Sequence, residues 1–217
     1  MLNNFKVGIR LAVGFAITLA LLLAIALLGI SRISNLNAQV DELATVKYPT
    51  TVYANDIVDA LNVIARSLRN SALVKAPEDS VKELDRIVEQ RKTIGDRIEK
   101  LEKAPLDDKG RTLVKKMVEA RKAYVPELEK AIELGRTGKR DELVGALMSS
   151  VRKTQNAYFD AVTELISHLS HSVEQAGKDA AEDAANARQT MTILAVVAAL
   201  LTALFGFFIT RSITAPV

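Results

Sequence analysis

Two long stretches without a charged side chain constrain the fold more than any other feature of this sequence. They are residues 11–31 and 189–210, and an arginine stands at both ends of each stretch (Arg10, Arg32, Arg188 and Arg211). A helix rises about 1.5 Å per residue, so about 20 apolar residues cross the roughly 30 Å hydrocarbon core of a bilayer. We therefore expect two membrane-spanning helices, with an insert at residues 32–188 held between them.

The charges near the N-terminus indicate how these helices are oriented. Lys6 and Arg10 lie in a short segment, residues 1–10, that contains no acidic side chain. By the positive-inside rule this segment is cytoplasmic, so two crossings return the C-terminus to the cytoplasm and leave the insert outside. The first apolar run is longer than the about 7–15 residues of a signal-peptide core. We expect an uncleaved anchor in a bacterial inner membrane, with the insert in the periplasm.

The charge of the insert excludes a nucleic-acid-binding surface. The chain has a net charge of +3, but all 26 acidic side chains lie between Asp41 and Asp183. Against them stand 24 basic side chains, once the five that flank the apolar runs are set aside from the total of 29. The insert is therefore close to neutral, whereas nucleic-acid binding requires clustered positive charge. The chain contains no cysteine, which fits an oxidising compartment.

The insert has the pattern of four amphipathic helices. They are residues 32–75, residues 77–103, residues 107–134, and a last helix from about residue 140 without a break into the second crossing. Pro77, Asp107 and the glycine-containing segment 135–139 mark the turns, with Asp107 as a helix N-cap. Tyr48-Pro49 marks a break within the first helix. Four helices with short connections pack as an up-down-up-down four-helix bundle, so the expected fold is all-α.

Two arginines interrupt the apolar lines of the second and third helices. Arg91 stands between Ile87 and Ile94, where the helical period requires an apolar residue, and Arg121 interrupts the next helix in the same way. Folding the two helices back about residue 106 places Arg91 opposite Arg121. Arginine binds carboxylates through parallel N–H groups, and an unpaired guanidinium inside a bundle is costly. We predict that a small di- or tricarboxylate, or an amino acid carboxylate, binds between them.

Polar side chains expected at the same level complete this predicted ligand site. Its members are Arg91, Arg121, Tyr124, Arg152, Thr154, Tyr158 and Asn62. The alternative is that Glu or Asp of a neighbouring helix pairs each arginine, or that the aliphatic stems carry the charges out to solvent. A second candidate site consists of Arg66 and Arg69 on the polar face of the first helix, which would line a groove between two copies of the bundle.

No pattern in the sequence indicates an enzyme. It contains no cysteine nucleophile, no glycine-rich phosphate loop, and neither a GxSxG nor an HExxH motif. The two histidines, His168 and His171, lie one helical turn apart, and a metal site requires three or four converging ligands. We expect both histidines to be exposed to solvent, and we expect no catalytic residue, metal or cofactor.

The segment after the second crossing, residues 209–217, reads ITRSITAPV. It resembles the start of a HAMP linker, whose first helix follows an I-T-R-S-I-x-x-P pattern, so residues 211–217 are expected to begin one. Together with the basic N-terminus, the two crossings and the long fourth helix, nearly the whole chain resembles the sensor half of a methyl-accepting chemotaxis protein of the four-helix-bundle type.

This resemblance implies a homodimeric chemoreceptor that binds a small ligand outside the cell and assembles into receptor clusters. A signalling part after Val217 would pass the signal to a cytoplasmic adaptor and histidine kinase. Membrane sensor kinases and cyclic-dinucleotide enzymes share the same front half, so these outputs are alternatives, as is a ligand-free structural or adaptor membrane protein. In a dimer we expect the first and fourth helices, including the alanine-rich run 176–187, to form a membrane-proximal stem from two copies.

Overall fold

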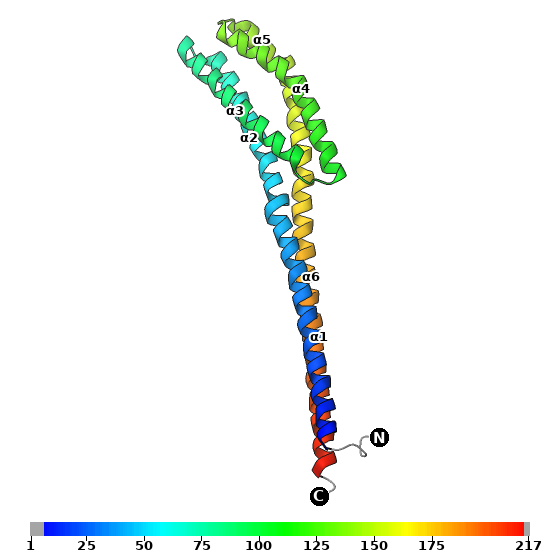
Figure 1. Ribbon diagram of the computed structural model, residues 1–217. Coiled ribbons are helices and arrows are strands. Elements are labelled where there is room, and N and C mark those ends of the chain that lie inside the picture. The colour runs from blue at the N-terminus through cyan, green and yellow to red at the C-terminus, as the bar shows by residue number, and fades with distance from the viewer. Residues whose placement is uncertain (1–6, 215–217) are drawn as a thin grey trace. The chain divides into compact units, whose positions relative to one another are not determined.

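The computed structural model describes residues 7–214, which are almost entirely helical. In chain order the helices are α1 (Val7–Glu42), a π-helical segment η2 (Leu43–Lys47), α2 (Tyr48–Leu73), α3 (Pro77–Lys103), α4 (Asp108–Arg136), α5 (Arg140–Met148) and α6 (Ser150–Thr214) (Figure 1). Between residues 7 and 214 there is no strand. The all-α fold class is confirmed. The last three residues of the expected linker segment, 215–217, lie outside the described residues.

The chain divides into two compact units. One consists of residues 42–175, and the other of residues 1–41 and 176–217. The first, the bundle unit, contains α2 to α5 and the first part of α6, and the second contains the two apolar helices. Residues 32–41 and 176–188, expected within the insert, belong with the apolar helices.

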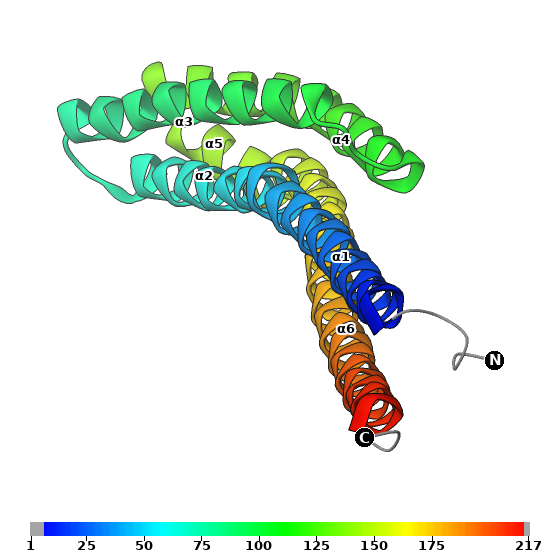
Figure 2. The ribbon, with the colours of Figure 1, turned by 60° about the horizontal axis from the view of Figure 1, so that its bottom comes forward.

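The core of the bundle unit is formed by apolar residues at helical spacing, as expected from the sequence. From α2 and α3 it includes the fully or almost fully buried side chains of Ile57, Leu61, Ile64, Leu68, Leu84, Ile87, Ile94 and Ile98. Each such side chain stabilises the fold by about 1.5–3 kcal/mol relative to an exposed one. A short connection joins α2 to α3, which lies alongside it (Figure 2). The apolar stripes therefore determine which faces of the helices meet.

Two turns of the bundle unit depend on particular residues. Asp107 is the N-cap of α4, as predicted: its Oδ1 accepts a hydrogen bond from the backbone N–H of Gly110 at 2.7 Å. A Cβ on Gly110 would lie 2.8 Å from that oxygen, so this close approach requires glycine. Gly138, with φ of 71°, provides the left-handed residue in the turn between α4 and α5.

The predicted break at Tyr48-Pro49 takes the form of the π-helical segment η2, which ends directly before Tyr48. Pro49 has no N–H, so it cannot donate the α-helical hydrogen bond to the carbonyl of residue 45. A wider turn accommodates this loss. The hydroxyls of Thr50 and Thr51 donate to the carbonyl of Lys47, at 2.8 and 3.1 Å.

The expectation of one uninterrupted helix from residue 140 is wrong. Ser149 separates α5 from α6 with φ of −121° and ψ of −97°, outside the helical region. Its hydroxyl donates to the carbonyl of Gly145 at 2.7 Å, and the hydroxyl of Ser150 donates to Glu127 of α4 at 2.6 Å. No proline or glycine stands at this break, so the sequence carried no signal for it.

In the second unit, α1 and the C-terminal part of α6 approach each other closely. A Cβ on Gly14 would lie 2.8 Å from Ile209 Cδ1, and one on Gly29 would lie 2.4 Å from Met191 Cε. Large apolar side chains point away from this contact, and that of Phe15 is 74% exposed. Both helices are long and apolar enough to cross a membrane.

Candidate functional site

A groove in the bundle unit brings together residues that the sequence analysis had assigned to two different sites. We call it the arginine groove, and its cavity of about 460 Å³ is within the range of small-molecule pockets. Its lining consists of Asn62, Ala65, Leu68 and Arg69 of α2, Leu147 and Met148 of α5, and Arg152, Gln155, Asn156 and Phe159 of α6. Asn62 and Arg152 come from the first predicted site, and Arg69 from the second.

The charges of the arginine groove are unbalanced, because two of its lining residues are arginines and none is acidic. Arg69 uses its Nε to donate to the carbonyl of Ala65 at 3.1 Å, which leaves its terminal nitrogens for other partners. Within residues 7–214, the guanidinium of Arg152 pairs with no carboxylate. The groove is therefore suited to an anion that also presents hydrogen-bond acceptors and donors to Asn62, Gln155 and Asn156.

Only some members of the central cluster predicted around Arg91 and Arg121 come together inside the bundle. The rings of Tyr124 and Tyr158 lie 6.0 Å apart between centroids, and both residues are buried. A Cβ on Gly95 of α3 would lie 3.9 Å from a terminal nitrogen of Arg121, so this arginine lies against α3. Tyr124 and Tyr158 therefore lie together inside the bundle, and the role of this cluster in binding a ligand stays a prediction.

Arg91 differs from the expected interior cation. Its guanidinium forms an ion pair with Glu129 of α4, with 2.7 Å between the nitrogen and the oxygen, and its side chain is 35% exposed. The premise of two unpaired cations facing each other inside the bundle is thus wrong for Arg91. An ion pair with a neighbouring helix, the alternative considered from the sequence, describes it.

The hydroxyl groups of Tyr124 and Tyr158 are buried without a hydrogen-bond partner in the described part of the protein. Burial raises the pKa of both hydroxyls above their ordinary value of 10, while the nearby charge of Arg91 lowers that of Tyr124 and the charge of Arg121 lowers that of Tyr158. Both tyrosines are therefore neutral at physiological pH. Neither tyrosine lines the arginine groove.

The other predicted members lie apart from these two clusters or are already engaged. Thr154 donates to the carbonyl of Ser150 at 2.9 Å within its own helix. Arg66 is exposed and does not line the groove, although Arg69 on the same helix does. Gln155, Asn156 and Phe159 were missed by the sequence analysis. Their spacing from Arg152, at three, four and seven residues, was the signal that could have identified one common helix face.

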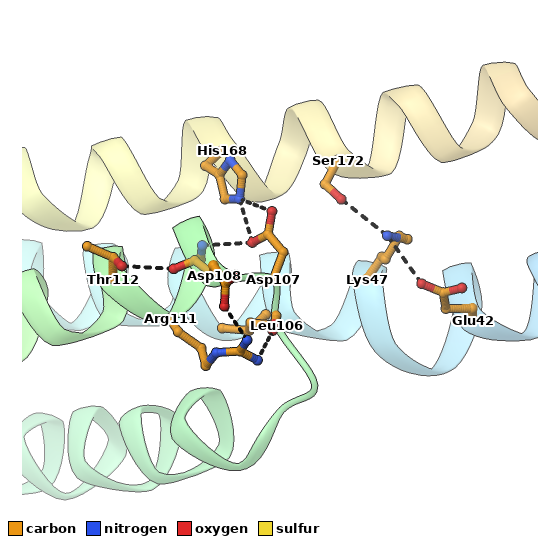
Figure 3. A network of polar contacts seen from close by, with 10 residues as sticks. Glu42, Lys47, Leu106, Asp107, Asp108, Arg111, Thr112, His168 and Ser172 are labelled. Carbon is orange, nitrogen blue, oxygen red and sulfur yellow. Dashed lines mark hydrogen bonds and ion pairs between the residues drawn. The ribbon is translucent and has the colours of Figure 1, made fainter.

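A polar network connects the turn before α4 to α6 (Figure 3). His168 Nε2 lies 2.9 and 3.1 Å from the two carboxylate oxygens of Asp107. The hydrogen bond with His168, followed by that from the N–H of Gly110, lowers the pKa of Asp107 below its ordinary value. The expectation that both histidines are exposed is therefore wrong for His168, whose side chain is only 14% exposed, and right for His171.

Comparison with known proteins identifies the family. Residues 4–185 match the model of a family described as a four helix bundle sensory module for signal transduction. No curated protein and no solved structure matches the chain. The match covers most of the chain, including α1, the helices of the bundle unit and the connections between them. The chain therefore belongs to the family of four-helix-bundle sensory modules for signal transduction.

Proposed function

We propose that this protein is a chemoreceptor of the bacterial inner membrane, with the bundle unit in the periplasm and both termini in the cytoplasm. Membership of a sensory family and the two helices long enough to cross a membrane support this topology. The acid-free N-terminal segment with Lys6 and Arg10 supports its orientation. The protein senses a ligand and carries out no catalysis.

The ligand in this proposal is a small organic acid or an amino acid, bound through its carboxylate in the arginine groove. One observation carries the proposal: Arg69 and Arg152, from two helices, line one cavity that has no acidic side chain. A carboxylate would be held by parallel N–H groups of these arginines, while Asn62, Gln155 and Asn156 would bind its other polar groups. Phe159 offers an apolar surface to its carbon skeleton.

Binding is tested by calorimetry on the full chain in a mild detergent, after a thermal-shift screen of di- and tricarboxylates and amino acids. Charge-assisted hydrogen bonds contribute about 1.5–3 kcal/mol, so Arg69→Ala or Arg152→Ala should each weaken binding roughly ten- to a hundred-fold. Arg66→Ala is the matched control, because Arg66 is an exposed arginine of the same helix that does not line the groove. The affinity of the Arg66→Ala variant for the ligand should stay within about twofold of that of the unmodified protein.

Arg91→Ala and Arg121→Ala distinguish the groove from the interior of the bundle. If these two variants abolish binding while Arg69→Ala and Arg152→Ala still bind the ligand, the ligand binds at the central cluster. The assignment to the arginine groove is then wrong. If no carboxylate binds to the unmodified protein, the ligand class is wrong.

The proposed receptor is a homodimer that controls a cytoplasmic histidine kinase through an adaptor, within larger receptor clusters. The family description, which specifies signal transduction, supports a downstream partner. Fusion of residues 1–217 to the signalling half of a characterised chemoreceptor tests this output. Kinase activity that changes with the identified ligand, and does not change in Arg152→Ala, is the expected result; constant activity in the unmodified fusion contradicts it.

A further inference from the structure

A second cavity, which the proposed ligand site does not involve, lies between α1 and α6 within the unit of apolar helices. We call it the stem cavity, and its volume is about 510 Å³. Gly29 and Met191 form one end of it, and Gln39 and Asp183 lie at the other, with Arg32 and Arg188 between these ends in sequence. The cavity therefore has an apolar end, a cationic middle and a polar end.

The position of Arg32 and Arg188 in the sequence indicates that the stem cavity lies at one surface of the membrane. Arg32 is the first charged residue after the apolar run 11–31, and Arg188 is the last one before the run 189–210. Because α1 and α6 run in opposite directions, both arginines lie at the same surface of the membrane that the two runs cross. Gly29 and Met191 belong to the apolar runs, so the cavity extends from the hydrocarbon edge into the headgroup layer.

The charges in the cavity leave both arginines available. Asp183 is the acidic residue of its lining, and its carboxylate accepts a hydrogen bond from Gln39 Nε2 at 2.7 Å. Among the residues that the structure describes, neither Arg32 nor Arg188 forms an ion pair. Two guanidiniums can together grip one phosphate through several parallel N–H groups, which an ammonium cannot do.

We infer that the stem cavity binds an anionic phospholipid, which the orientation proposed above places in the outer leaflet. The phosphate of its headgroup lies between Arg32 and Arg188, and an acyl chain follows the apolar surface at Gly29 and Met191. An anionic headgroup is favoured over a zwitterionic one, whose ammonium group would add a third positive charge. The second copy in the expected dimer would contact α1 on a different face, because a two-fold symmetric contact through the cavity itself would bring four guanidiniums together.

Native mass spectrometry of the full chain, released from detergent with phosphatidylglycerol or phosphatidylcholine of identical acyl chains, tests this inference. About tenfold stronger retention of phosphatidylglycerol is expected, which corresponds to one charge-assisted contact. The double variant Arg32→Gln, Arg188→Gln should remove this preference. Arg211→Gln is the matched control, because it removes the arginine at the opposite end of the same apolar run, and it should keep the preference.

Several outcomes overturn the inference. Equal retention of the two lipids by the unmodified protein excludes an anion-selective site, and this measurement needs no variant that could misfold. Loss of the preference in Arg211→Gln shows general attraction of cations to the membrane surface. Displacement of the lipid by an equal concentration of soluble glycerophosphate shows a site for free phosphate that does not require acyl chains. The single variants Arg32→Lys and Arg188→Lys keep the positive charge but lose the parallel N–H groups. They should weaken the preference for phosphatidylglycerol, and an unchanged preference contradicts the inferred contact.

Discussion

The carboxylate of Asp107 caps helix α4 and at the same time contacts His168 of α6, with 2.9 Å between Oδ1 and Nε2. One side chain thereby accepts a hydrogen bond from a free backbone N–H at the start of α4 and connects that start to a neighbouring helix. The α4 end of the turn between α3 and α4 is consequently held by two contacts, one from the Gly110 N–H and one with the imidazole.

Replacement of His168 tests this connection through the pH dependence of stability. His168 lowers the pKa of Asp107 from its ordinary value of 3.8, so the pair stabilises the folded state above that pH and loses this effect as the pH falls through the lowered value. His168→Ala should therefore lower the free energy of unfolding at neutral pH by less than about 1 kcal/mol, since the carboxylate remains largely exposed. The difference should shrink below about pH 4.

Thermal unfolding of the full chain in detergent, followed by circular dichroism at several pH values, measures this effect. His171→Ala is the control, because His171 lies one helical turn away and is exposed. A loss of stability that is the same for both variants, or that persists unchanged at pH 3, would contradict a specific contact with Asp107.

The buried hydroxyls of Tyr124 and Tyr158 lead to a second prediction. A buried hydroxyl without a partner costs about 1–3 kcal/mol, so Tyr124→Phe and Tyr158→Phe should leave the protein equally stable or more stable. Tyr124→Ala should instead lose about 3–5 kcal/mol through the cavity that it leaves. Tyr48→Phe, at an exposed position, provides the reference in chemical denaturation. Destabilisation by more than about 1 kcal/mol in either phenylalanine variant would reveal a bound partner for the hydroxyl.

Arg97 forms a contact between α2 and α3 that should contribute more than the ordinary surface ion pairs. It lies 2.6 Å from Asp56 and 2.5 Å from Asp96, and its guanidinium carbon lies 5.6 Å from the centroid of the Tyr53 ring. Arg97→Ala should destabilise the protein by about 1–2 kcal/mol, and Arg97→Lys by less. The control Arg86→Ala removes a pair within one helix and should cost less than about 0.5 kcal/mol. Equal effects of the two alanine variants would refute the special role of Arg97.

The expected dimer can be tested by disulfide crosslinking, which is simple in a chain without native cysteine. Single cysteines placed along residues 33–46 should crosslink two copies with a period of three to four residues, as helices that face each other do. The period should lengthen in η2, where the helical turn is wider. Non-reducing electrophoresis of membranes measures the crosslinks. Crosslinking that is absent at every position would exclude this dimer.

Much of the bundle could be predicted because its signals are local. The apolar spacing of Ile57, Leu61 and Ile64 indicated the buried face of α2. Pro77 and the Asp107 cap marked the starts of α3 and α4 within one residue. The break at Ser149 could not be predicted in this way. It depends on contacts such as that of Ser150 with Glu127, which only the folded bundle creates.

The grouping of the candidate residues was harder to predict, because residues assigned to two separate sites line one groove. Asn62, Arg69 and Arg152 had all been identified as candidates. The position of each turn predicts the height of a residue along the bundle, but it does not predict the rotation of each helix about its own axis. Rotation decides that Arg152 faces α2 and that Arg91 faces Glu129, and it follows from packing across helices.

The break at Ser149 also bears on how receptors of this kind can diversify. Leu147 and Met148 precede the break and Arg152 follows it, and all three line the arginine groove. Under the proposed function, a substitution at Leu147 or Met148 would change both the lining of the ligand site and the side chains next to the joint between α5 and α6. In a lineage descended from this chain, ligand preference and the geometry of the α5–α6 joint would then evolve together.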